Sequence, residues 1–136
     1  MSQLKKALIV SPYLDNLGGG ERYMLSAASV LEQLGYQVTF AWDNAAQIVE
    51  LATMLGIKLN PPRVDPLIKS LYTQNNTLKM YRATKEYDVV VYLSDGSIPL
   101  LGGKKNIVHF QVPFHGVGGR KIGHQLKLKS IHHVVV

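Results

Sequence analysis

The strongest strand signal in the sequence is the run Asp88-Val89-Val90-Val91-Tyr92-Leu93. It is rich in β-branched and aromatic residues, and its length is typical of a strand rather than of a helix. A second apolar run, Leu4-Lys5-Lys6-Ala7-Leu8-Ile9-Val10-Ser11, lies near the start of the chain. Apolar runs of this length predict strands that are buried on both faces, as in parallel sheets covered by helices.

The segment after the first run has the apolar spacing of a helix. Five residues recur at three- and four-residue intervals: Met24, Ala27, Ala28, Leu31 and Leu34. Gly35 follows them at the position where a glycine commonly ends a helix. The alternating stretch Gln37–Trp42 then predicts the second strand of the sheet.

A second helix is expected directly after this strand, and either Asp43 or Asn44 can cap it. Its buried stripe consists of Ile48, Leu51, Ala52 and Leu55. The stretch Ile57–Leu59 predicts a short third strand, which Pro61 and Pro62 bring to an end.

The middle of the chain predicts a helix from Pro66 to about Lys85, and Asn75-Asn76 makes an interruption of this helix plausible. After the run at Asp88, we expect a further strand from about Asn106 to Val112. The residues Val134–Val136 have the composition of one more buried strand.

Strands that alternate with helices predict an α/β fold, here a three-layer Rossmann-like parallel sheet that forms one domain over residues 1–136. With 136 residues and 46% hydrophobic residues, the chain is large enough for one domain with a proper core. Sheets of this kind bind ligands at the carboxyl ends of their strands. Function is therefore expected in the loops after Ser11, Leu93 and Val112.

Composition excludes several classes of protein. The sequence holds no apolar run of membrane-spanning length, no apolar segment of a signal peptide at its start and no cysteine. A cytoplasmic domain is the expectation. The net charge of +6 is uneven: residues 1–50 carry 3 Lys/Arg against 5 Asp/Glu, and residues 51–136 carry 12 against 4. A basic half favours phosphate-bearing ligands, anionic lipid or nucleic acid, in that order, and a solvated surface is an equal alternative.

The triplet Gly18-Gly19-Gly20 lies between the first strand and the first helix. Glycines let the backbone approach a ligand closely, and the amides at a helix N-terminus suit a phosphate; a flexible turn is the alternative. The loop is not a P-loop, because no Gly-Lys-Ser/Thr sequence ends it. It also lacks the third glycine of the dinucleotide fingerprint, since Tyr23 occupies that position. Asp43 mimics the acidic ribose ligand of dinucleotide-binding proteins, but capping of the next helix is its expected role.

Three blocks of the sequence resemble family 4 glycosyltransferases. The first is Leu17-Gly18-Gly19-Gly20-Glu21-Arg22-Tyr23 with its following helix and the turn Leu34-Gly35-Tyr36-Gln37-Val38-Thr39, which is similar to that family's first βαβ unit. The second is Tyr87-Asp88-Val89-Val90-Val91, and the third is Asn106-Ile107-Val108-His109-Phe110-Gln111-Val112-Pro113. The blocks follow the family's order across nearly the whole chain, and the first is the most specific.

The resemblance implies the N-terminal part of a retaining glycosyltransferase of the GT-B architecture, in which two Rossmann-like domains face a cleft. The substrates would be a nucleotide-sugar donor and a sugar, lipid-linked or other acceptor, with no further cofactor. By the match, Gly18, Gly19 and Gly20 would hold the donor diphosphate through backbone amides. His109 would contact the donor sugar as the catalytic histidine, and a buried structural histidine is the alternative.

The chain also departs from the family. The second domain, which carries a Glu-x₇-Glu motif and most of the donor site, is not in the sequence, so we expect a fragment of the N-terminal domain that is inactive alone. Glu21, Ser94, Asp95 and Pro113 are candidates for the cleft or the acceptor side, and Asp15 would share its rim. Glu21 itself is expected to be stabilised by the helix dipole. No metal site is expected, because His132 and His133 would point to opposite faces of a strand.

The basic segment Arg120–Ser130 has two interpretations. It would contact anionic lipid at the inner face of the membrane or a phosphorylated acceptor, or it is a solvated helix flank, which we favour. The alternative to a transferase is a stand-alone Rossmann-like module that binds a phosphorylated ligand. A Rossmann dehydrogenase is disfavoured by Tyr23, nucleic-acid binding ranks last, and an exposed sheet edge would allow self-association.

Overall fold

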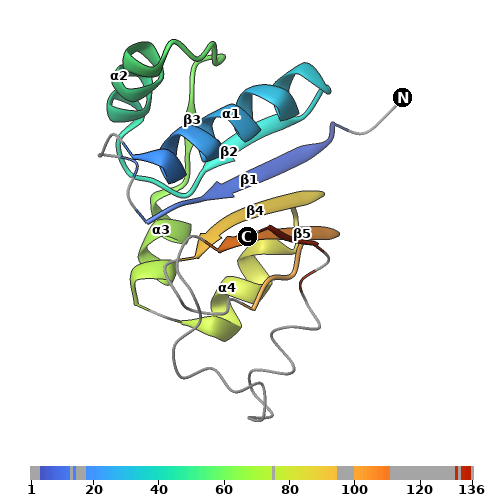
Figure 1. Cartoon of the computed structure of the whole chain (residues 1–136). Helices are drawn as coiled ribbons and strands as arrows, with labels where there is room; N and C mark the ends of the chain where they lie inside the picture. The colour runs from blue at the N-terminus through green and yellow to red at the C-terminus, as the bar shows by residue number, and fades with distance from the viewer. Residues whose placement is uncertain are drawn as a thin grey trace.

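The computed structural model describes residues 4–12, 14, 18–74, 76–94, 100–110, 131 and 133–135. Its strands form one sheet in the order β3-β2-β1-β4-β5-β6, and every neighbouring pair is parallel (Figure 1). In chain order the elements are β1 (Lys6–Val10), α1 (Gly19–Gln33), β2 (Gln37–Phe40), α2 (Ala45–Leu55), β3 (Arg63–Val64), α3 (Pro66–Thr73), α4 (Thr77–Thr84), β4 (Val89–Ser94), β5 (Lys105–Phe110) and β6 (His133–Val135).

The two apolar runs form the centre of the sheet, β1 and β4, and lie side by side with Leu8 paired to Val90. Residues alternate between two hydrophobic cores because successive side chains of a strand point to opposite faces. Ala7 and Ile9 lie in one core, and Leu8 and Val10 lie in the other. Both faces of the central strands are therefore buried, as their unbroken apolar sequence predicts.

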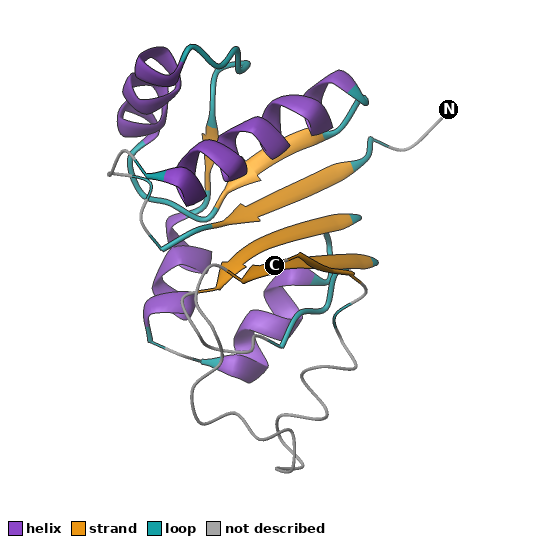
Figure 2. Cartoon of the chain, in the orientation of Figure 1, coloured by secondary structure: helices purple, strands orange, loops and turns teal. Residues whose placement is uncertain are grey.

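Helices cover each face of the sheet, so the three-layer α/β fold is confirmed (Figure 2). The first core contains residues of α1 and α2: Met24, Leu25, Ala28, Ile48, Leu51 and Ala52. The second core contains residues of α3 and α4: Ile68, Leu71 and Met80.

Helix ends follow the local sequence. Gly35 has a φ of +92°, and the amide of Tyr36 donates to the Leu31 carbonyl at 2.9 Å, so α1 ends at the predicted glycine, in a Schellman motif. The cap of α2 is Asn44, whose Oδ1 accepts from the Ala46 amide at 3.0 Å. The alternative role of Asp43 as this cap is wrong, since its carboxylate pairs elsewhere.

The predicted third strand is displaced along the chain. Ile57–Leu59 is not a strand, because the Ile57 amide closes the end of α2 by donating to the Ala52 carbonyl at 2.9 Å. The strand β3 lies after the two prolines, where Arg63 and Val64 pair with Thr39 and Phe40. Proline has no amide to donate to a strand pair, so pairing starts after Pro62.

The predicted interruption of the long helix is confirmed. α3 ends at Thr73, and α4 begins at Thr77 with Asn76 as its cap, whose Oδ1 accepts from the Lys79 amide at 3.3 Å. The last strand is present as His133–Val135. The predicted end of β5 at Gln111-Val112 and the basic segment Arg120–Ser130 lie outside the described residues.

The connection from β4 to β5 passes close to the end of α4. The Gly102 amide donates to Thr84 Oγ1 at 2.8 Å, and this hydroxyl donates to the Met80 carbonyl at 2.9 Å. A Cβ atom on Gly102 would collide with the Tyr81 carbonyl oxygen and lie 2.9 Å from Lys85 Cγ. Only glycine fits between these atoms, so the backbone at Gly102 is held directly against α4.

One buried tyrosine, Tyr87, makes the stability of the fold depend on pH in the alkaline range. Desolvation in the second core, with a smaller contribution from the charge of Glu86, raises the pKa of Tyr87 to about 12. An unfolded chain ionises this tyrosine near pH 10, so the folded state loses relative stability between about pH 10 and pH 12. We expect this residue alone to remove about 2 kcal/mol by pH 12.

The measurement is urea unfolding of the native chain and of Tyr87→Phe at about pH 8 and pH 11. The phenylalanine variant should lose less stability between the two pH values than the native chain does. Tyr36→Phe, which removes the hydroxyl of a half-buried tyrosine elsewhere, is the matched control and should keep the native loss. Equal alkaline losses in all three proteins would contradict the assignment.

Candidate functional site

The strand order creates a topological switch point between β1 and β4. The chain leaves β1 through α1 towards β2 on one side, and it leaves β4 towards β5 on the other side (Figure 1). In doubly wound sheets the crevice outside the carboxyl ends of two such strands is the usual ligand site. Ser11 follows β1, Ser94 ends β4 and His109 lies one residue before the end of β5, so three candidate polar side chains come from this edge.

The glycine triplet forms the start of α1 at this edge. Gly18 is the N-cap in extended conformation and Gly19 is the first helical residue. The first helical bond is donated by the Arg22 amide to the Gly18 carbonyl at 3.1 Å. The amides of Gly19, Gly20 and Glu21 precede it, and such groups are available to an anion at the positive end of the helix. A Cβ on Gly19 would meet nothing within 4 Å, so this backbone faces open space.

Glu21 occupies the space beside Gly18. Its side chain folds back so that a Cβ on Gly18 would collide with a carboxylate oxygen and lie 3.4 Å from Cδ. The residue is only 5% exposed and stands in the first turn of α1. A carboxylate in this place is favoured by the helix dipole, as expected from the sequence. Gly18 is therefore fixed by the packing of Glu21 as well as by the turn.

His109 lies against the first turns of α1. Its ring stacks on that of Tyr23 with 4.2 Å between the centroids and an interplanar angle of 19°. Nδ1 of His109 is buried, and among the described residues it has no hydrogen-bond partner. Buried polar atoms in native proteins nearly always have a hydrogen-bond partner, so we expect a water or a ligand to bind this nitrogen.

The two serines at the same edge are deeply buried. Ser11 is 2% exposed, and its Oγ has no hydrogen-bond partner among the residues that the structure describes. Ser94, one of the cleft candidates, is also buried at the end of β4. The other candidates, Asp95 and Pro113, lie outside the described residues, as does Asp15.

Sequence reasoning missed the partnership of Tyr23 and His109. Tyr23 drew notice only because it replaces a glycine of the dinucleotide fingerprint. Its position in α1 just after the glycine triplet was the available signal, since α1 packs on the sheet against β1, β2 and β4. The pairing of β4 with β5, which places His109 opposite Leu93, completes the contact.

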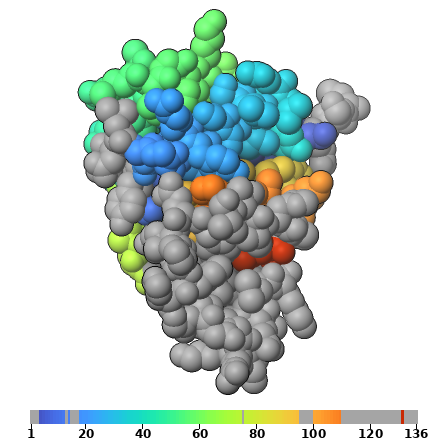
Figure 3. Space-filling model, viewed as in Figure 1, coloured from blue at the N-terminus to red at the C-terminus, as the bar shows by residue number. Residues whose placement is uncertain are grey.

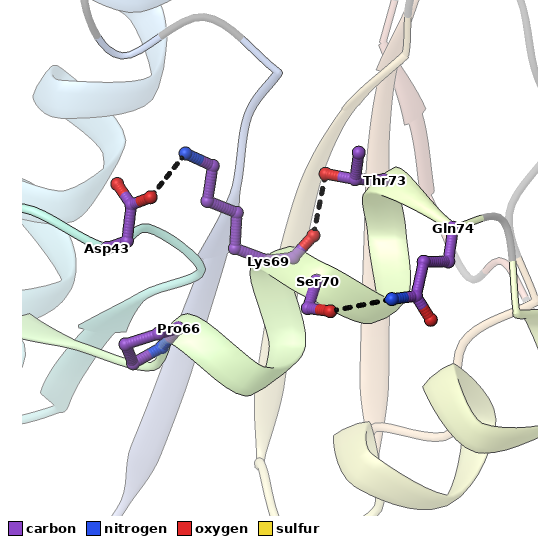
Figure 4. A pocket seen from close by; sticks show the side chains of 6 residues that line it. All are labelled: Asp43, Pro66, Lys69, Ser70, Thr73 and Gln74. Atoms are coloured by element: carbon purple, nitrogen blue, oxygen red, sulfur yellow. Dashed lines mark hydrogen bonds and ion pairs between the residues drawn. The ribbon is translucent and has the colours of Figure 1, made fainter.

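Asp43 belongs to a separate surface at the end of β2. It forms an ion pair with Lys69, whose Nζ lies 2.9 Å from Oδ2 (Figure 4). The same Nζ lies 3.9 Å from the centroid of the Trp42 ring. The pair borders a shallow hollow of about 260 Å³ next to α3. The hollow is lined by Asp43, Pro66, Lys69, Ser70, Thr73 and Gln74. Thr73 Oγ1 and Gln74 Nε2 already donate within α3, to the Lys69 carbonyl and to Ser70 Oγ.

The described residues contain neither a membrane-spanning helix nor a metal-binding cluster. No helix in the described ranges is both long and apolar enough to cross a bilayer. No cluster of three or more His, Cys, Asp or Glu residues suited to a metal ion occurs within those ranges. Comparisons of the chain with protein-family models, with curated proteins and with solved structures found no match.

Proposed function

We propose that the chain is the N-terminal Rossmann-like part of a retaining GT-B glycosyltransferase, which moves a sugar from a nucleotide-sugar donor to a sugar, lipid-linked or other acceptor. The observation that carries the proposal is the juxtaposition at the switch point. The ring of His109, whose buried Nδ1 has no hydrogen-bond partner in the part of the chain that the structure describes, lies against α1 directly behind the glycine triplet at its start. One ligand with both a diphosphate and a polar sugar would use both features.

The chemistry follows from the charge that develops during transfer. When the bond between the sugar and the diphosphate breaks, negative charge grows on the leaving diphosphate. The amides of Gly19 and Gly20, at the positive end of α1, would donate to it, and the space around Gly19 is open. This interaction strengthens as the charge grows, so it lowers the barrier rather than only binding the donor.

His109 would act on the sugar side of the same bond. A neutral imidazole has one nitrogen that can donate a hydrogen bond and one that can accept one. Tyr23 fixes the plane of the ring by stacking, so the histidine would be oriented before the substrate binds. The second domain of such an enzyme would hold most of the nucleotide. A cytoplasmic location fits this substrate pair.

The second candidate is a module that binds a phosphorylated ligand without chemistry. The open amides at the start of α1 favour it equally, because they need only an anion. Titration calorimetry of this chain with inorganic phosphate and a nucleoside diphosphate separates the two. Tight binding by the 136-residue chain alone favours the module, while a requirement for a second domain favours the transferase.

The test of the transferase uses His109→Ala and Gly19→Leu in a chain that also carries a donor-binding domain. Each variant should lower kcat by roughly 10²- to 10³-fold, because each removes an interaction that is strongest in the transition state. The fold should persist, since Gly19 is exposed with open space around it. The readout is release of nucleoside diphosphate from labelled donors.

The matched control is Ser26→Leu, which adds the same side chain to an exposed position of α1 beyond its first turn. It should leave turnover unchanged. Normal turnover in both test variants would exclude this site, and a loss in Ser26→Leu as large as in Gly19→Leu would point to a general effect on α1.

A further inference from the structure

A basic surface covers the edge of the sheet opposite the candidate site, where the strands begin. We define this amino-edge surface by Leu4, Lys5, Leu34, Lys85, Lys104 and Lys105. Figure 3 shows the start of the chain in blue, close to the end of α1 in cyan and near the start of β5 in orange, on the right of the view.

Backbone hydrogen bonds bring these segments together. The Asp88 amide donates to the Lys6 carbonyl at 2.8 Å, and the Lys105 amide donates to the Asp88 carbonyl at 2.9 Å. The Gln37 amide donates to the Lys5 carbonyl at 2.8 Å, which sets the turn at the end of α1 beside the first strand. Segments that are 82 residues apart, at Lys6 and Asp88, therefore share one surface.

The surface is strongly positive. Residues 4–6, 85–88 and 104–105 together hold five lysines and two carboxylates, Glu86 and Asp88. A hydrogen bond from the Lys6 amide and the ammonium of Lys104, 3.1 Å away, hold the pKa of Asp88 below its ordinary value. The charge of Asp88 is thus balanced by Lys104, and the side chains of Lys5, Lys85 and Lys105 are exposed to solvent.

The same surface is unusually apolar for a charged edge. Leu4, next to Lys5 in the chain, is 61% exposed, and Leu34, two residues before Tyr36, is 65% exposed. Two of the lysines lie over tyrosine rings: Lys5 Nζ is 5.7 Å from the centroid of Tyr36, and Lys85 Nζ is 4.9 Å from that of Tyr81. Lysine ammonium groups near aromatic rings, together with exposed leucines, make the surface amphipathic rather than purely polar.

We infer that the amino-edge surface binds an anionic lipid bilayer peripherally. Lysines near a membrane gain from the negative surface potential, tyrosines suit the headgroup level and exposed leucines gain by entering the acyl boundary. The phosphate backbone of a nucleic acid would pair with the lysines, but it would offer no apolar contact to the two exposed leucines. The charge and the apolar side chains together therefore favour lipid.

This inference does not depend on the proposed transferase activity. The central strands place about 15–20 Å between the two edges of the sheet, so a bilayer at the amino edge would leave the switch point facing away from it. Membrane binding should accordingly be the same in His109→Ala as in the native chain. Loss of one property leaves the other intact, and the two proposals can fail separately.

The experiment is co-sedimentation of the chain with vesicles of phosphatidylcholine alone and of equimolar phosphatidylcholine and phosphatidylglycerol. Binding should require phosphatidylglycerol and weaken with salt. The double substitution Lys5→Glu with Lys105→Glu should lower the partition coefficient roughly tenfold or more, because each lysine near the surface contributes substantially. Among the described residues, neither lysine forms an ion pair, so the fold should persist.

The control with the same change of charge is Arg22→Glu with Lys79→Glu, in the first turns of α1 and α4. Arg22 is separated from the amino edge by most of α1, about 15–20 Å and beyond the Debye length at physiological salt. This control should bind nearly as the native chain does. Leu4→Ser with Leu34→Ser should weaken binding while preserving its salt dependence.

Three results would overturn the inference. They are equal binding to neutral and anionic vesicles, equal losses in the test and control charge variants, and retention by a polynucleotide without binding to vesicles. Far-UV circular dichroism of each variant separates a loss of binding from a loss of fold.

Discussion

Replacing Gly102 by alanine should lower the free energy of unfolding by about 3 kcal/mol. The new methyl group would collide with the Tyr81 carbonyl oxygen, which is part of α4 and cannot rotate away. Either the connection from β4 to β5 or the last turn of α4 has to move. Movement would also stretch the bond from the Gly102 amide to Thr84 Oγ1, now 2.8 Å long inside the protein.

Urea unfolding followed by circular dichroism measures this loss, with the slope used to check that the transition stays cooperative. Gly19→Ala is the control, because a Cβ there meets nothing within 4 Å. Its stability should stay within about 0.5 kcal/mol of the native value, or rise slightly, since alanine is the better helix former. A loss of under about 1 kcal/mol in the free energy of unfolding of Gly102→Ala would contradict the prediction and show that the backbone near Gly102 can shift at little cost.

Shortening a side chain of the central strand β1 should lower the stability by a similar amount on either face of the sheet. Leu8→Ala and Ile9→Ala are each expected to cost about 3 kcal/mol, because both side chains are 0% exposed and each leaves a cavity in a different core. In a sheet with one solvated face, one of two neighbouring positions would tolerate the change. Leu4→Ala, an exposed leucine just before the strand, is the matched control and should cost under about 0.5 kcal/mol.

Thermal and urea unfolding of the three variants test this symmetry. Additivity of the two core losses in the double variant is not expected, since the positions are adjacent in one strand. A large loss at Ile9 with a small one at Leu8 would mean that α3 and α4 cover the sheet loosely.

Local sequence signals predicted most of the fold because they depend on neighbours in the chain. The apolar runs at β1 and β4 predicted strands buried on both faces. Gly35 predicted the end of α1 because glycine tolerates the positive φ that the structure shows there. The third strand was misplaced because Ile57 has a high strand propensity, while its amide is used to close α2. The competition between a helix ending and a strand start is decided by backbone bonds, which composition does not reveal.

The candidate site was predictable only in outline. The carboxyl ends of the strands and the glycine triplet could be located because connectivity fixes them. The stacking of Tyr23 on His109 could not, since it depends on how α1 crosses the sheet and on the register of β5 against β4. Asp43 was misjudged for a similar reason: its partner Lys69 lies 26 residues further along the chain.

The central place of β1 in the sheet has a consequence for the order of assembly during synthesis. Its partner β2 follows within a single helical connection, but its other partner β4 pairs Val89 with Ala7 only after three further helices and a strand have been made. At a synthesis rate of about 5–20 residues per second, one edge of β1 would stay unpaired for several seconds. During that interval an apolar strand edge is exposed to other nascent chains. Protection of the growing chain by a chaperone should therefore matter most before residue 94 leaves the ribosome, and least afterwards.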